Sequence, residues 1–237
     1  MIDLHCHLLP GVDDGPSTIH DAVRMARVAV EDGTTTIACT PHRRPRFPNT
    51  PAIVDEAVAM FRERLAEEGI PLELVAGLEL DIDELAAMDV EERAASALGD
   101  GPWLLVEMPF HGWPLDLAGL MTELEMKGLR ALIAHPERCS SVQKNPDRMR
   151  DLIGRGALVQ VNAESITGML GDQPQRAAER LLRAGFAHVI ASDAHTPSRR
   201  PPGLTAALER AAEVLRCLPG EIAWMVDDVP RAMISGD

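Results

Sequence analysis

Short apolar segments alternate with amphipathic segments along the whole chain. Strands are expected where apolar and β-branched residues form short runs, and helices where apolar residues recur at helical spacing. The expected strands lie at the start of the chain and at 34–40, 71–81, 103–109, 129–138, 157–162 and 187–195. The expected helices lie at 18–32, 52–69, parts of 82–101, 115–127, 145–155, 173–184, 204–215 and 221–233.

This alternation of strand and helix, joined by short loops, predicts an α/β fold with a parallel sheet and helices packed outside it. Residues of the kinds that bind metals follow most of the strands, which favours a closed or distorted barrel, because the strand ends of a barrel converge on one rim. The chain of 237 residues contains no long linker and no internal repeat. A single domain spanning 1–237 is therefore expected.

Composition narrows the class of protein. Hydrophobic residues make up 46% and charged residues 25% of the chain, and no apolar run approaches the roughly 18 residues of a membrane span. The net charge of −14 argues against broad nucleic-acid binding. The first residues lack the basic region of a signal peptide, so a cytoplasmic location without membrane insertion is expected.

The four cysteines, Cys6, Cys39, Cys139 and Cys217, show no C-x-x-C spacing. They indicate neither a disulfide framework nor a thiolate zinc site. None is followed six residues later by the arginine that a cysteine-phosphatase loop needs. Phosphatase chemistry on a cysteine is thereby disfavoured.

The first strand carries His5 and His7, and a Pro/Gly loop with two aspartates follows. Because side chains alternate along a strand, the two imidazoles are expected on one face and Leu4 and Cys6 on the other. Two imidazoles near carboxylates make half of a metal site. Taken alone, however, His-x-His is a weak signal.

Other strand ends strengthen this signal, because five of the eight histidines occupy such positions. In the first loop, either Asp13 or Asp14 could reach the ions, and Asp14 is the expected ligand. The predicted set is more than one ion can use, so two or three ions are expected, with Glu79 bridging. The absence of thiolates suits Mn²⁺, Fe or Zn²⁺. The candidate ligands are His5, His7, Asp14, His42, Glu79, Glu107, His135, Asp193 and His195.

Clustered divalent ions activate water and hold a phosphoryl oxygen, which predicts hydrolysis of a phosphate ester. Arginines follow three of the histidine-bearing strands and could hold the phosphate oxygens. The expected substrate-binding residues are Arg43, Arg44, Arg138, Arg199 and Arg200. The expected catalytic residues are Arg138, Arg200, His42 and Asp193.

Five motifs together resemble the PHP (polymerase and histidinol phosphatase) superfamily. They are Asp-x-His-x-His-Leu-Leu-Pro-Gly-Val-Asp-Asp-Gly-Pro at 3–16, Thr-Pro-His at 40–42, Gly-x-Glu at 77–79, His-Pro-Glu-Arg at 135–138 and Ser-Asp-Ala-His at 192–195. More narrowly, the chain resembles the bacterial metal-dependent protein-tyrosine phosphatases of capsular and extracellular polysaccharide operons.

The resemblance implies a distorted (β/α)7 TIM-like barrel, a trinuclear site usually filled with manganese or iron, and dephosphorylation of a partner tyrosine autokinase. It implies oligomerisation through the first helix, although Asp21 and Arg24 fit the acidic-x-x-Arg pattern only loosely, and it places Phe47 as an aromatic flap residue. The implied ligand sets are His5, His7, Glu79 and Asp193; Glu79, Glu107 and His135; and Asp14, His42 and His195.

Other functions remain open at this stage. A small-molecule phosphomonoesterase resembling histidinol phosphatase would use the same metals, and phosphotyrosine and histidinol phosphate would distinguish the two. A catalytically idle metal-binding module is disfavoured by the full ligand set. A polymerase-type exonuclease is disfavoured by the charge of −14.

Overall fold

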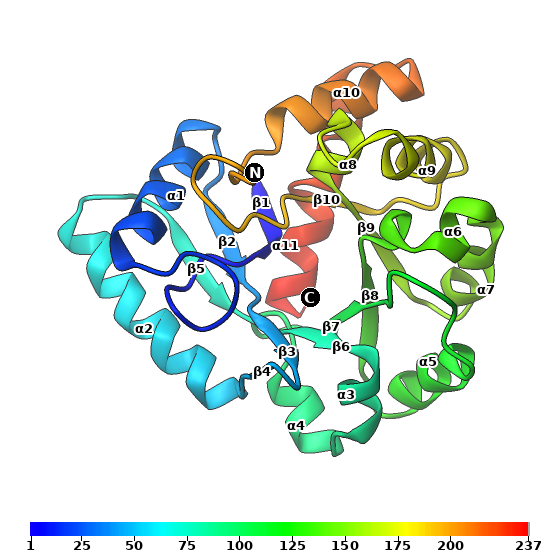
Figure 1. Cartoon of the computed structure of the whole chain (residues 1–237), viewed down its shortest axis with the longest axis horizontal. Coiled ribbons are helices and arrows are strands. Elements are labelled where there is room, and N and C mark those ends of the chain that lie inside the picture. Colours follow the sequence, from blue (N-terminus) through cyan, green and yellow to red (C-terminus); the bar gives the residue numbers. More distant parts are fainter. Residues whose placement is uncertain (237) are drawn as a thin grey trace.

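Parallel strands alternate with helices in the computed structural model, which describes residues 1–236 (Figure 1). The strands are β1 (Ile2–Cys6), β2 (Thr36–Cys39), β3 (His42–Arg44), β4 (Phe47–Pro48), β5 (Glu73–Ala76), β6 (Glu79–Asp81), β7 (Trp103–Glu107), β8 (Arg130–Ala134), β9 (Leu158–Asn162) and β10 (Val189–Ala191). The α-helices are α1 (Ile19–Glu31), α2 (Pro51–Glu67), α3 (Ile82–Ala87), α4 (Val90–Ala95), α5 (Leu117–Met126), α6 (Ser140–Lys144), α7 (Met149–Gly154), α8 (Ala163–Thr167), α9 (Asp172–Arg183), α10 (Thr205–Leu215) and α11 (Asp228–Ser235).

The strands form a distorted barrel, as expected. One sheet has the order β1-β2-β5 and the other β10-β9-β8-β7-β6-β3-β4. Along the chain, β3 follows β2 and β6 follows β5. The pair β2–β5 lies in the first sheet and the pair β3–β6 in the second, and both pairs are parallel. The two sheets are therefore continuous with each other along these strands. The circle closes between β10 and β1, where a bridge joins Cys6 to Ala194. Helices surround the strands, as Figure 1 shows.

The strand β1 changes register along its length. Its pairing with β2 is irregular between Asp3 and Cys6. Leu4 packs in the same hydrophobic cluster as Ile2, whereas Cys6 packs in the other cluster. The expectation that Leu4 and Cys6 share a face was therefore wrong: the irregularity lets Leu4 fill the core while His5 and His7 turn to the site.

Two hydrophobic clusters enclose the barrel wall. The larger cluster lies between the strands and the surrounding helices. The smaller cluster joins Leu4 on β1 to Leu105 on β7, Leu132 on β8 and Met233 on α11. Because it draws on strands all round the barrel, it fills the interior, and α11 covers one end. The site must therefore lie at the opposite end, where the strands finish.

The chain departs from the expected elements mainly near proline. The segment expected to be helical at 221–233 is a 3-10 helix (Pro219–Met225) followed by α11, because Pro230 is accommodated only in the first turn of a helix. The basic loop after His42 contains the β3–β4 hairpin. The last strand is shorter than 187–195, since β10 ends at Ala191 and the backbone then turns irregular. Among the described residues, no helix combines the length and the apolar character needed to cross a bilayer.

Gly101→Ala should destabilise the protein, because a Cβ at this position would overlap the backbone carbonyl oxygen of Met233 in α11. Overpacking of this kind costs about 1–3 kcal/mol in the free energy of unfolding. Urea denaturation would measure the loss. Gly154→Ala is the matched control, because its Cβ would meet no atom within 4 Å. Equal loss in both variants would contradict this packing of α11.

Candidate metal centre

Four ligand atoms converge above the end of β1. The Nε2 atoms of His5 and His7 are 3.3 Å apart, and each lies 3.3 Å from Glu79 Oε2. Asp193 Oδ1 is 3.5 Å from the first nitrogen and 3.4 Å from the second. All four side chains are buried. This is a compact set of two nitrogen and two oxygen donors.

The partners of the two imidazoles fix which nitrogen carries the proton. His7 Nδ1 lies 2.6 Å from Asp13 Oδ2, and His5 Nδ1 lies 3.1 Å from Gln160 Oε1. Each Nδ1 therefore donates its proton to an oxygen, and each Nε2 is turned toward the two carboxylates. Burial alone would lower the pKa of His7, but hydrogen bonds to Asp13, Asp193 and Glu79 raise it well above its usual value, so this group of atoms favours positive charge among the donors. The donor set therefore fits a divalent metal ion.

Glu79 connects further groups of possible ligands. Its Oε1 lies 2.9 Å from His135 Nε2, and its Oε2 lies 2.6 Å from His42 Nδ1. Oε2 is buried and has no hydrogen-bond partner of good geometry. The ligand atoms of His5, Glu79 and His135 form one close group, and those of His42, Glu79 and Glu107 form another. One buried carboxylate thus reaches several groups, as a bridging ligand must.

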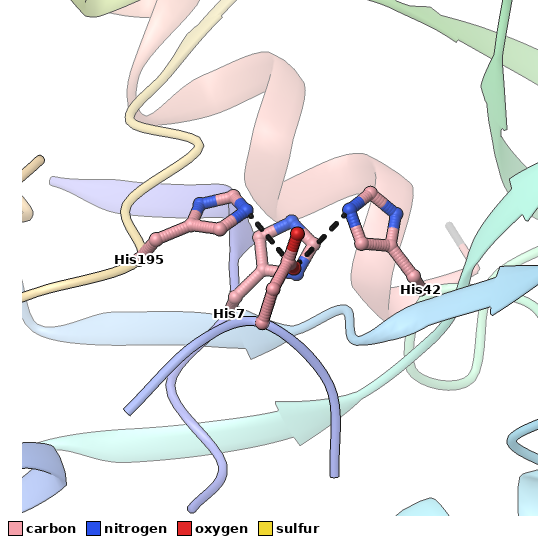
Figure 2. Close-up of side chains that lie close together, drawn as sticks. His7, His42 and His195 are labelled. Atoms are coloured by element: carbon pink, nitrogen blue, oxygen red, sulfur yellow. Dashed lines mark ion pairs between the residues drawn. The ribbon is translucent and has the colours of Figure 1, made fainter. Parts of the chain in front are cut away.

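Another group gathers residues from three separate parts of the chain. His7, His42 and His195 turn their rings toward one another in Figure 2. Asp14 Oδ1 lies 3.5 Å from His42 Nε2 and 3.4 Å from His195 Nε2. Together these four side chains form the fourth close group of metal-type ligand atoms among the described residues. All nine predicted ligands are therefore brought to one end of the barrel.

The two neighbouring aspartates of the first loop occupy different positions. Asp14 faces the imidazoles and its side chain is 45% exposed, whereas that of Asp13 is fully buried. Besides His7, Asp13 accepts hydrogen bonds from the backbone N–H groups of Gly15 and His42. A Cβ on Gly15 would lie only 2.5 Å from the backbone oxygen of His7, so the loop needs glycine to fold this closely. Asp14 thus faces the cluster while Asp13 orients His7.

Burial and charge shift the pKa values within the centre. Burial opposes ionisation of Glu79, but the facing His5 and His42 hold the pKa of that carboxyl well below its usual range. Burial lowers the pKa of His135 to about 4, so its imidazole is neutral at pH 7. Burial also raises the pKa of Glu107 to about 8, with Glu79 adding to the effect. Glu79 is thus ionised before any metal ion binds, and bound cations would favour the ionised form of Glu107 as well.

Two residues of the centre have left-handed backbone conformations. His135 has φ 31° and directly follows β8, and Asp193 has φ 52° and is the second residue after β10. A non-glycine residue in this region carries strain that its surroundings must compensate. The turn at Asp193 comes after β10, and the Asp193 backbone N–H donates to the His5 carbonyl oxygen, where the barrel closes between β10 and β1. The strain thus lies at positions where chain direction changes into the site.

Arg138 and Arg200, two of the expected arginines, donate hydrogen bonds to the same carboxylate oxygen. Asp193 Oδ2 accepts hydrogen bonds from Arg138 Nη1 at 2.8 Å and from Arg200 Nη2 at 2.6 Å. Asn162 Nδ2 donates to this oxygen as well, at 2.7 Å. The side chains of the arginines are 23% and 25% exposed, whereas Asn162 is buried. The arginines can therefore reach a bound anion, and Asn162 cannot.

The remaining expected arginines differ from these two. Arg44 Nη1 lies 3.7 Å from Glu107 Oε2, beside the centre. Arg43 instead pairs with Glu92 on α4 at 2.8 Å, because adjacent residues of β3 point to opposite faces. Its expected role in substrate binding is not supported by this position. Arg199 is exposed, and among the described residues no hydrogen bond or ion pair joins its side chain to the ligand groups.

Several residues of the site were not predicted from the sequence. Gln160 and Asn162 lie two positions apart on β9, a strand from which no site residue was expected. Their signal was visible: polar side chains at alternate positions of an otherwise apolar strand face one side together. Phe110 packs its ring 4.6 Å from the Arg138 guanidinium and carried no such signal. Phe47, expected as an aromatic flap residue, stacks at 10° on the ring of His42.

Comparison with known proteins adds the family context. Residues 1–215 match the family model described as capsular polysaccharide synthesis, CpsB/CapC. The chain is 38% identical over 201 residues to the tyrosine-protein phosphatase YwqE of Bacillus subtilis, covering 84% of this chain and 79% of the relative. It is 28% identical over 219 residues to the tyrosine-protein phosphatase CpsB of Streptococcus pneumoniae, covering 90% of each.

Solved structures agree with this. The chain matches a structure from work on YwqE of Bacillus subtilis and CpsB of Streptococcus pneumoniae, described as unique metal-dependent tyrosine phosphatases, with a TM-score of 0.89 and 33% identity. That match covers 100% of this chain and 95% of the other. The histidinol phosphate phosphatase of Lactococcus lactis shares the fold at a TM-score of 0.55 and 10% identity, covering 91% and 94%.

Asn162→Ser should weaken metal binding without unfolding the protein. Serine can still cap α8, where Asn162 Oδ1 accepts from the Glu164 N–H, but it is too short to keep the bond to Asp193. Loss of such an outer partner costs roughly 10–100-fold in metal affinity. Titration of metal-free protein with Mn²⁺ would measure it. Asn145→Ser is the control, because the Asn145 side chain also caps a helix but bonds only locally, to the Asp147 N–H. Unchanged affinity in Asn162→Ser would contradict the positioning role.

Proposed function

Because the chain belongs to the CpsB/CapC family of capsular polysaccharide synthesis proteins, we propose that it dephosphorylates tyrosines of a bacterial tyrosine autokinase. The chain is a metal-dependent tyrosine-protein phosphatase of the CpsB/YwqE type. The family expected from the sequence motifs is thus confirmed. That the substrate is a tyrosine autokinase rests on the resemblance to phosphatases of polysaccharide operons.

The observation that carries the chemistry is the meeting of the His5 and His7 Nε2 atoms with two buried carboxylates, beside two arginines. Three ion positions are proposed around it. In support, Glu79 contacts several ligand groups at once. Glu107 groups with His42 more closely than the resemblance implies. The proposed sets are His5, His7, Glu79 and Asp193; Glu79, Glu107 and His135, with His42 near Glu107; and Asp14, His42 and His195.

Oxygen and nitrogen donors without thiolates suit Mn²⁺ or Fe, and also Zn²⁺. Divalent ions held there would polarise the phosphoryl group and activate water for attack on phosphorus. Arg138 and Arg200 are proposed to exchange their contact with Asp193 for the non-bridging phosphate oxygens, to which a guanidinium can bind bidentately. Asn162 then keeps Asp193 oriented while the arginines hold the substrate.

The leaving group eases the reaction. A tyrosine phenolate has a parent pKa of about 10, well below that of an alkoxide, so its departure needs less help from a general acid. An arrangement of cations and arginines is therefore sufficient for phosphotyrosine. An alkyl phosphate such as histidinol phosphate would make greater demands on proton donation.

A cysteine nucleophile is not supported by the structure. Burial raises the pKa of Cys39 to about 12 and that of Cys6 well above its usual value. Both thiols therefore stay protonated and poorly reactive. The four cysteines are free, which supports a cytoplasmic, reducing location for the enzyme as part of the proposal.

Metal-free protein should regain turnover of a phosphotyrosine peptide when Mn²⁺, Fe²⁺ or Zn²⁺ is added, with the ions compared at equal concentration. Phosphate release would be measured for this peptide and for histidinol phosphate. A higher kcat/KM for the peptide is expected. A clear preference for histidinol phosphate would replace the proposed function with that of a small-molecule phosphomonoesterase.

His42→Ala and Asp193→Asn should each lower kcat by more than about 100-fold, beyond the loss typical of an outer partner. His42→Ala removes a proposed ligand atom, Asp193→Asn removes the carboxylate charge and one of its two oxygens, and asparagine tolerates the left-handed backbone at 193. Circular dichroism and metal analysis should show a folded protein with reduced metal content. Near-normal turnover in either variant would count against the proposed ligand sets.

A further inference from the structure

A cavity of about 710 Å³ lies next to the metal centre, between α3, the loop after β7 and the first half of α5. Its lining combines apolar surface, including Trp113 and Leu115, with carboxylates. Neither the proposed metal positions nor the phosphate-binding arginines use it. A concave surface of this size with a few polar groups is typical of a binding site.

The cavity opens from the same rim as the metal ligands. Asp81, in its lining, pairs in register with the ligand Glu107 and lies two residues beyond the ligand Glu79. At about 3.3 Å per residue, Asp81 is roughly 7 Å along the strand from Glu79. Phe110 separates the cavity from the phosphate-binding arginines: its ring contacts Arg138, and its neighbours Pro109 and His111 line the cavity.

The charge of the cavity is acidic. The lining described by the structure contains Asp81, Asp83, Asp116 and Glu123 but no lysine or arginine. Of these, Glu123 is paired with Arg93 at 2.7 Å, and Asp81 accepts a bond from the Asp83 N–H. Among the described residues, the side chains of Asp83 and Asp116 form no ion pair and accept no hydrogen bond.

Asp116 occupies the N-cap position of α5, yet its side chain makes no capping hydrogen bond. Its carboxylate lies over the first turn of the helix, where only a glycine, Gly119, leaves it room. Asp83 and Asp116 are both exposed residues. These two carboxylates are thus available to a ligand, and they face a cavity that also offers apolar surface.

We propose that this cavity binds a lysine or arginine side chain located within about three residues of the phosphotyrosine in the protein substrate. The methylene stem would lie against Trp113 and Leu115, and the cationic group would meet Asp83 and Asp116. An extended peptide advances about 3.3–3.6 Å per residue, so such a side chain reaches the cavity while the phosphate is at the metal centre. This inference rests on the proposed phosphotyrosine activity and makes the cavity a determinant of substrate sequence.

The test compares phosphotyrosine peptides that are identical except for lysine, glutamine or glutamate at single positions one to three residues on either side. The enzyme is used with its metals, and p-nitrophenyl phosphate serves as a substrate too small to reach the cavity. The matched variants are Asp83→Asn/Asp116→Asn and Asp147→Asn/Asp151→Asn. The second pair removes the same charge from exposed positions around α7, which controls for the general attraction of cationic peptides to an acidic protein.

The wild-type enzyme should favour lysine over glutamate at one or more positions by about three- to tenfold in kcat/KM, the size expected for two partly exposed charge pairs. The effect should lie mainly in KM and fall with added salt. Asp83→Asn/Asp116→Asn should bring the ratio close to that of the glutamine peptide, with turnover of p-nitrophenyl phosphate unchanged. The control variant should keep the wild-type ratio.

The proposal is overturned if wild-type enzyme shows no preference for lysine, or if the control variant loses the preference equally. A loss of p-nitrophenyl phosphate turnover in Asp83→Asn/Asp116→Asn would also overturn it, because the two carboxylates would then serve the centre or the fold. Failure of the underlying activity looks different: no phosphotyrosine peptide would be turned over by metal-loaded wild-type enzyme.

Discussion

The change of register within β1 is the constraint on which the rest of the structure depends. A regular strand would place Leu4 and the two histidines on opposite sides. Residues of β1 could then contribute to the core or to the metal centre, but not to both. The irregular register between Asp3 and Cys6 lets the first half of the strand fill the barrel and the second half supply ligands. The buried Asp3 supports it by accepting hydrogen bonds from the N–H groups of His5 and Ser192, which ties β1 to the segment after β10.

The metal centre depends in turn on residues that do not belong to it. The side chains of Asp13, Gln160 and Asn162 each hold a proposed ligand by one hydrogen bond, and each also accepts a hydrogen bond from a backbone N–H group. Such outer partners select the tautomer of an imidazole and the rotation of a carboxylate before any ion binds. The centre is therefore shaped by the protein, and the energetic cost of gathering so many donors is met by the folding of the barrel around them.

The sequence predicts the barrel and the gathering of the nine candidate residues at one end of it, because both follow from local patterns. Each strand is short and apolar, and ligand types such as His135 recur where a strand stops. The positions of Arg43 and Arg44 could not be told apart in this way, because they depend on the β3–β4 hairpin. Side chains alternate along β3, so Arg43 pairs with Glu92 and Arg44 lies toward Glu107. The hairpin was hidden by prolines that suggested a loop. Phe110 was beyond prediction, because its contact with Arg138 depends on how two loops pack.

The left-handed backbone at His135 and Asp193 restricts these two positions twice over. Ligand chemistry limits each to a small set of side chains, and backbone sterics independently favour histidine, aspartate, asparagine or glycine over β-branched and bulky residues. Cysteine and glutamate, which could also bind metals, satisfy only the first condition. A change of metal preference through exchange of ligand type is therefore easier at positions with ordinary backbone, such as Glu79 or Glu107, than at the two turns where the strands enter the site.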